Sequence, residues 1–195
     1  MTMRAAFLGL LLLSACAAAP PAPRLYLLEP PQAAPVAPGS GAEAVGVREI
    51  SLPLYARRLQ IAAEDGAGAV SASEDHLWAE EPARAATRLV ARRLAMLRGG
   101  PVYADPWPQG AAPAIILSLE ADRLLGGFGG EARLEGQMSM SCAAARDRIA
   151  TRPFALRAPA PGADHAGLVA AYGAVLAALA EEAAAALETF GPCPR

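Results

Sequence analysis

The chain contains no lysine, so all 17 of its basic residues are arginine. This absence accompanies abundant alanine, glycine and proline, and we interpret it as a GC-rich coding bias rather than a chemical requirement. With 19 acidic residues the net charge is −2 at pH 7. The chain has no basic patch that would indicate nucleic-acid binding.

Motifs for catalysis or metal binding are also missing. The chain has two histidines, His76 and His165, but neither an HExxH motif nor a paired Cys/His spacing predicts a metal site. The glycine cluster at residues 126–130 joins two strand-like segments, whereas a phosphate-binding loop follows a strand and opens a helix. A Ser-His-Asp set whose members meet only in space stays open. We expect no enzymatic activity, no metal and no dissociable cofactor.

The apolar stretch near the N-terminus, residues 5–13, is about half as long as a membrane-spanning helix. One positive charge, Arg4, precedes it and small residues follow it, which is the layout of a secretory signal. The run "LSAC", which ends at Cys16, resembles the bacterial lipobox, whose cysteine receives diacylglycerol on its sulfur and an acyl chain on its amine. Ordinary secretion with an incidental cysteine is the alternative.

These features divide the chain into three parts. We expect residues 1–15 to be a lipoprotein signal peptide, and residues 16–23 to be a lipidated Cys16 followed by a semi-rigid Pro/Ala tether. Residues 24–195 are long enough for one domain. Ala17, in place of aspartate, favours sorting to the outer membrane by resemblance to enterobacterial lipoproteins, with the domain on the periplasmic face.

Hydrophobic periodicity predicts an α+β domain. Two segments, residues 112–122 and 131–142, alternate apolar and polar residues with the period of an antiparallel sheet. Shorter strands are expected within residues 24–30, 44–53, 58–64, 69–75, 101–107 and 148–158. Helical spacing predicts one helix within residues 75–100 and a long one from Asp164 to Gly191. We expect a mixed, largely antiparallel sheet with both helices packed on its inner face.

Two cysteines and two tryptophans are the remaining candidate functional residues. Cys142 and Cys193 form an even pair in an oxidising compartment, so both a disulfide and two free thiols are open. Trp78 precedes the first helix and Trp107 lies in "DPWP". Each either fills the edge of the core or is an exposed anchor at a partner interface, where tryptophan is over-represented.

Taken in order, several segments resemble the ABC-type transport auxiliary lipoproteins of the PqiC/YmbA family. These are the lipobox, "RLYLLEP", "GVREISLPLYARRLQI", "DHLWAEEPARAATRLVARRLAML", "ADPWP", "AIILSLEADRLLGGFGGEARLEGQMSM" and the long C-terminal helix. One departure is "SMSC" at residues 139–142, where bulkier apolar residues are expected.

The resemblance implies a fold like the N-terminal domain of TolB. It also implies an outer-membrane lipoprotein that docks a periplasmic MCE-domain protein and its inner-membrane transporter subunits, supports envelope integrity and forms a homo-oligomeric ring. An envelope scaffold or peptidoglycan-associated lipoprotein without a transport role is one alternative. A lipid carrier with a cavity beneath the C-terminal helix is another.

Overall fold

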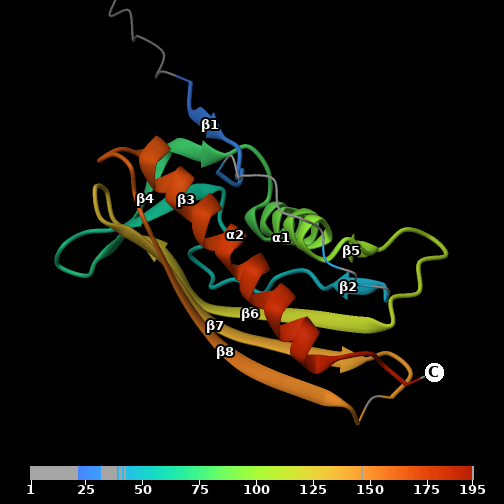
Figure 1. Ribbon diagram of the computed structural model, residues 1–195. Coiled ribbons are helices and arrows are strands. Elements are labelled where there is room, and N and C mark those ends of the chain that lie inside the picture. Colours follow the sequence, from blue (N-terminus) through green and yellow to red (C-terminus); the bar gives the residue numbers. More distant parts are fainter. Residues whose placement is uncertain (1–21, 32–38, 40, 42, 146, 195) are drawn as a thin grey trace, which may run out of the picture.

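The protein was analysed as a computed structural model, which describes residues 22–31, 39, 41, 43–145 and 147–194. The predicted signal peptide, Cys16 and most of the tether lie outside the described residues. The described chain forms two sheets and two helices (Figure 1). In chain order these are β1 (Arg24–Tyr26), β2 (Val45–Val47), β3 (Gln60–Glu64), β4 (Val70–Trp78), α1 (Pro82–Arg98), β5 (Val102–Ala104), β6 (Ile115–Gly126), β7 (Glu131–Cys142), β8 (Ile149–Pro159) and α2 (His165–Phe190).

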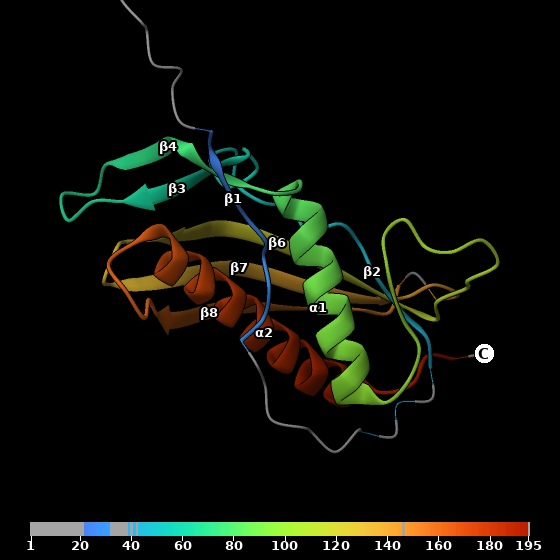
Figure 2. The same ribbon diagram turned by 90° about the horizontal axis from the view of Figure 1, so that it is seen from above.

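The larger sheet has the strand order β5-β2-β6-β7-β8. Strands β6, β7 and β8 are antiparallel neighbours, whereas β2 pairs parallel with both β5 and β6. Both helices cover one face of this sheet (Figure 2). The inner-facing residues of β6, among them Leu117 and Leu119, are buried against the helices, while Glu120 on the opposite face is exposed. The predicted α+β class and its mixed, largely antiparallel pairing are confirmed.

A second sheet, of three strands in the order β1-β4-β3, corrects the expectation of a single sheet. The turn between β3 and β4 is held by Asp65, whose carboxylate accepts hydrogen bonds from the backbone N–H groups of Ala67 and Ala69. The inner face of this small sheet packs on α2, where the Tyr172 hydroxyl donates to the carbonyl of Ala62 at 2.9 Å. The two sheets together therefore wrap the N-terminal half of α2 (Figure 1).

Helix α1 lies within the segment, residues 75–100, in which the sequence predicts a helix. Residues 76–78 belong to β4 because they pair with β1, and the helix begins only at Pro82. Glu81 is the N-cap, and its carboxylate accepts hydrogen bonds from the backbone N–H groups of Ala83 and Arg84. Gly99 ends the helix with a φ of 69°, the left-handed conformation that glycine adopts at low cost.

Helix α2 follows the predicted boundaries closely. Asp164 caps it by accepting a hydrogen bond from the N–H of Gly167 at 2.8 Å, and it ends before Gly191. In the described part of the chain it is the one helix long and apolar enough to cross a membrane. However, 61% of its most apolar 18-residue stretch is buried inside the protein. The helix forms the centre of the hydrophobic core, as expected from its apolar stripe.

Residues 139–142, "SMSC", which depart from the family pattern, are nevertheless part of a well-packed sheet. Met138, Met140 and Cys142 point to the inner face and are almost completely buried. Ser139 and Ser141 alternate with them and face outward. Unbranched methionine side chains fill the space beneath the helices that bulkier residues would otherwise occupy.

Candidate functional site

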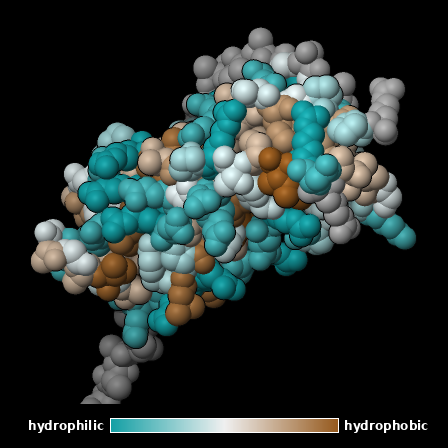
Figure 3. Space-filling model, turned by 90° about the horizontal axis from the view of Figure 1, so that it is seen from below, coloured by the Kyte–Doolittle hydropathy of each residue, from teal (hydrophilic) through white to brown (hydrophobic). Residues whose placement is uncertain are grey.

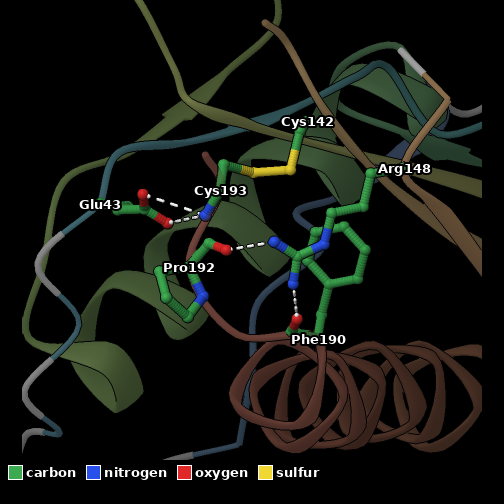
Figure 4. Close-up of a disulfide and its surroundings, with 6 residues drawn as sticks. All are labelled: Glu43, Cys142, Arg148, Phe190, Pro192 and Cys193. Atoms are coloured by element: carbon green, nitrogen blue, oxygen red, sulfur yellow. Dashed lines mark hydrogen bonds between the residues drawn. A yellow bond between two sulfur atoms is a disulfide. The ribbon is translucent and has the colours of Figure 1, made fainter. Parts of the chain in front are cut away.

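The structure joins Cys142 and Cys193 in a disulfide at one end of the molecule (Figure 4). Cys142 is the last residue of β7 and Cys193 follows α2, with their Cα atoms 5.6 Å apart. The backbone N–H of Cys193 also donates to the Glu43 carboxylate oxygens at 3.1 and 3.2 Å. These bonds tie the C-terminal tail to the larger sheet and to the segment that leads into β2.

Arg148, which the sequence analysis did not single out, holds the end of α2 (Figure 4). Its guanidinium donates to the carbonyl oxygens of Phe190 and Pro192 and lies 4.7 Å from the centroid of the Phe190 ring. A cation at this position satisfies carbonyls that the helix leaves unpaired and complements the negative end of its dipole. Its loop position, just before β8, gave no sequence signal for this contact.

Trp107 lies near the disulfide end, on the outer face of the larger sheet. Its ring covers Gly46 of β2 so closely that a Cβ there would be 2.6 Å from a ring carbon. The register places Gly46 beside Ile116, then Ser141, then Ile149, across four strands. This row, with Trp107 half-buried above its first member, is called the outer-face row below.

The outer face of the larger sheet is mainly hydrophilic (Figure 3). At the opposite end from Trp107, Glu131 forms ion pairs with Arg133 at 3.0 Å and Arg157 at 2.8 Å. The hydrogen bond from Arg133 is the main cause that lowers the pKa of the Glu131 carboxyl. The apolar members of the outer-face row, Ile116 and Ile149, thus belong to a face that is mainly polar and charged.

Of the two alternatives for Trp78, a core residue or an exposed anchor at a partner interface, the structure shows the core residue and excludes the exposed anchor. Only 7% of the residue is exposed, and its ring packs beside that of Tyr172 on α2, with centroids 6.0 Å apart. The cause is the extension of β4, which places Trp78 in register with Tyr26 on the inner side of the small sheet. Burial raises the pKa of the Tyr172 hydroxyl strongly.

The two histidines, distant in sequence, meet where the small sheet covers the start of α2. The imidazoles of His76 and His165 stack with centroids 3.7 Å apart and planes 4° apart. The Tyr26 hydroxyl lies 2.8 Å from Nδ1 of His76, and the Phe128 ring meets His165 edge-on. Burial is the main cause that lowers the pKa of His165, and His76 adds to it while Asp164 opposes it.

The described residues hold no cluster suited to a metal ion, and the hollow between the small sheet and α2 is too small for a lipid. They contain no cluster of three or more histidine, cysteine or acidic residues that could hold a metal ion. The hollow between the small sheet and α2, lined by Leu28, Trp78, Leu124 and Tyr172 among others, has a volume of about 20 Å³. Ligand pockets typically measure several hundred Å³, so this hollow does not support the lipid-carrier alternative.

Comparison with known proteins identifies the family. The model of the ABC-type transport auxiliary lipoprotein components matches residues 26–184, which span both sheets and most of α2. The chain belongs to this family. It is therefore related to auxiliary components of ABC-type transporters rather than to a known family of enzymes, and a lipoprotein family implies association with a membrane. A search of the curated proteins finds no match.

Solved structures share the fold. An uncharacterised protein matches with a TM-score of 0.65 and 16% identity over 85% of this chain and 99% of that one. A Xanthomonas campestris protein of the DUF330 family matches at 0.64, with 17% identity over 84% and 90%. This structure shows the same fold, and the family match over residues 26–184 confirms the resemblance drawn from the sequence. A PelC dodecamer from Paraburkholderia phytofirmans matches at only 0.39, with 14% identity over 73% and 87%.

Proposed function

We propose that this protein is an outer-membrane lipoprotein of an MCE-type ABC lipid transport system. In this proposal Cys16 carries the diacylglycerol and N-acyl lipid, residues 17–23 form the tether, and residues 24–195 form one domain in the periplasm. The domain docks the periplasmic MCE-domain protein, as one of several copies in a ring, and it supports envelope integrity without making or breaking a bond. The observation that carries the proposal is the family match over residues 26–184 behind a lipobox.

The structure suggests which surface meets the partner. Strand β1, which follows the tether, pairs with β4 at one end of the molecule. The C-terminus and the connection between β5 and β6, the segments that contain Cys193 and Trp107, lie toward the other end (Figure 1). The disulfide and Arg148 fix the tail and the β7–β8 connection at that far end. Ile149, which is 61% exposed, and half-buried Trp107 provide apolar contact area at this end. Apolar and aromatic side chains of this kind are typical of the central part of protein interfaces.

A fractionation experiment tests the anchored adaptor. The protein is expressed in its own host with either Cys16 or Cys16→Ser, and the outer membrane is separated from the soluble periplasm. We expect the parent protein in the outer membrane and the Cys16→Ser variant in the soluble fraction, with loss of resistance to envelope stress. Full resistance with the soluble variant would contradict the proposal, because the lipid on Cys16 would then have no role.

A second experiment tests the docking surface. Ile149→Asp places a charge in the outer-face row, whereas Met96→Asp places one at an equally accessible site on α1. We expect Ile149→Asp to reduce recovery of the MCE-domain protein in a pull-down and Met96→Asp to leave recovery unchanged. Equal recovery with both variants would exclude the outer-face row as the docking surface.

A further inference from the structure

The tethered end of the molecule exposes leucines that the fold does not use. Leu25 in β1 and Leu27 just after it are 64% and 56% exposed, while their neighbours Tyr26 and Leu28 turn inward. Tyr26 contacts His76 on the inner side of the small sheet, so the leucines lie on its outer side. A pair of leucines this accessible, on a strand at the edge of a sheet, is not explained by packing within the domain.

More residues of the same kind lie beside these leucines. The register places Leu25 beside Leu77 of β4, and Leu77 beside Gln60, the first residue of β3. The segment that leads into Gln60 contains exposed Leu59 and Leu54, together with exposed Arg57 and Arg58. The exposed residues Leu25, Leu27, Leu54, Arg57, Arg58 and Leu59 are called the leucine-arginine face.

The composition of this face fits the interfacial region of a phospholipid leaflet. Leucine side chains gain free energy when they enter the boundary between headgroups and acyl chains, and arginines bind lipid phosphates. Two acidic residues, Glu29 and Asp75, are also exposed near this end, so the charge is mixed. Burial of the leucines is therefore the main favourable contribution, and the arginines add contacts with phosphate.

The length of the tether determines what this face can reach. Only residues 17–23 separate Cys16 from β1, and a proline-rich chain extends about 3 Å per residue. The leucine-arginine face is thus held within a few nanometres of the lipid attached to Cys16. At such a short distance the effective concentration of the membrane surface is high, and even a weak contact becomes populated.

From these observations we infer that the leucine-arginine face rests on the periplasmic leaflet of the membrane that holds Cys16. The inference rests on the anchoring in the proposed function. It adds a second, non-covalent contact that fixes the orientation of the domain. Leu25 and Leu27 enter the interface, and the outer-face row with Trp107 and Ile149 is directed away from the bilayer.

Fluorescence quenching in vesicles tests the inference. Full-length lipidated protein carrying Leu27→Trp is reconstituted into vesicles of phosphatidylethanolamine and phosphatidylglycerol, with or without bromine on the acyl chains. The emission of the unsubstituted protein, from Trp78 and Trp107, is subtracted. The matched control is Ile149→Trp, an equally exposed aliphatic position at the other end of the molecule. Leu25→Trp serves as a second probe if Leu27→Trp fails to fold.

We expect the brominated lipid to quench the tryptophan at position 27 and to leave the one at position 149 unquenched. Vesicle flotation, measured on the same samples, separates this inference from the anchoring. Protein that floats without selective quenching at position 27 would overturn the leaflet contact while leaving the anchor intact. Protein that does not float would overturn both. Equal quenching at the two positions would also overturn the inference, because the domain would then have no fixed orientation.

Discussion

Cys142 and Cys193 are 51 residues apart in sequence, yet their sulfurs are bonded and close a loop that contains β8 and all of α2. Such a cross-link lowers the conformational entropy of the unfolded chain. For a loop of this length it raises the unfolding free energy by about 4 kcal/mol. The double variant Cys142→Ala/Cys193→Ala should therefore lose a few kcal/mol of unfolding free energy, measured by urea denaturation without reductant. Unchanged stability would mean that the bond does not form in the mature protein.

The unfolding free energy should depend on pH because His165, which stacks on His76, titrates differently in the folded and unfolded protein. The pKa of His165 is lowered in the folded protein, so the unfolded chain binds more protons than the folded one as the pH falls below about 6.5. The contribution of His165 is present above that pH and is lost as the pH falls through its lowered folded pKa. We expect the unfolding free energy to fall between pH 7 and pH 5.

A variant isolates this effect. His165→Gln removes the titrating ring at the start of α2 and should flatten the fall in unfolding free energy over the same pH range. Because the chain has only two histidines, His76→Gln is the natural comparison. It removes the stacked neighbour whose charge lowers the pKa of His165, so it should weaken the pH dependence to a lesser extent. If both variants showed the same pH dependence as the parent, the fall in unfolding free energy would not arise from His165.

Thr87 connects α1 to the chain that follows β2. Its fully buried hydroxyl donates to the carbonyl of Ala83 at 2.6 Å and accepts from the N–H of Ile50 at 2.9 Å. Thr87→Val keeps the shape and leaves the Ile50 N–H without this partner, which should cost about 1–3 kcal/mol of unfolding free energy. Thr189→Val, at an exposed position of α2, is the matched control and should change stability little. Equal effects would show that the buried hydrogen bond contributes nothing specific.

Gly173 should resist a substitution that usually stabilises helices. In the middle of an exposed helix, glycine-to-alanine gains about 1 kcal/mol. Here a Cβ would lie 1.9 Å from the carbonyl oxygen of Glu29, on the segment after β1. Gly173→Ala should therefore lower the melting temperature, while Gly66→Ala, in the open turn between β3 and β4, should leave it nearly unchanged. A melting temperature raised by Gly173→Ala would contradict this close contact.

The sequence predicted the elements whose residues carry a regular pattern. Strict alternation located β6 and β7, and the apolar stripe with Asp164 and Gly191 located α2. The strands of the small sheet were expected, but their grouping into a separate sheet was not, because β1 has three residues and its partner β4 is mostly exposed, so neither has a clear apolar face. The end of β4 was expected at residue 75 and lies at Trp78, because the pairing of residues 76–78 with β1 leaves no local pattern in the sequence.

The candidate sites depend on contacts that no local pattern encodes. Trp78 became a core residue through the register of β4 with β1, and Arg148 reached the end of α2 from a loop. The stacking of His76 and His165 joins residues from β4 and α2. Pairings of this kind are set by tertiary packing, which a single sequence does not reveal.

The measurement that tests the central claim most directly is a pull-down of the full-length, lipidated protein from its own cell envelope, analysed by mass spectrometry. The protein should recover an MCE-domain protein together with ABC transporter subunits, and the Cys16→Ser variant should recover less of both. Recovery of cell-wall proteins alone, or of no envelope protein enriched over a control lipoprotein, would contradict the role in lipid transport and leave only the fold and the family.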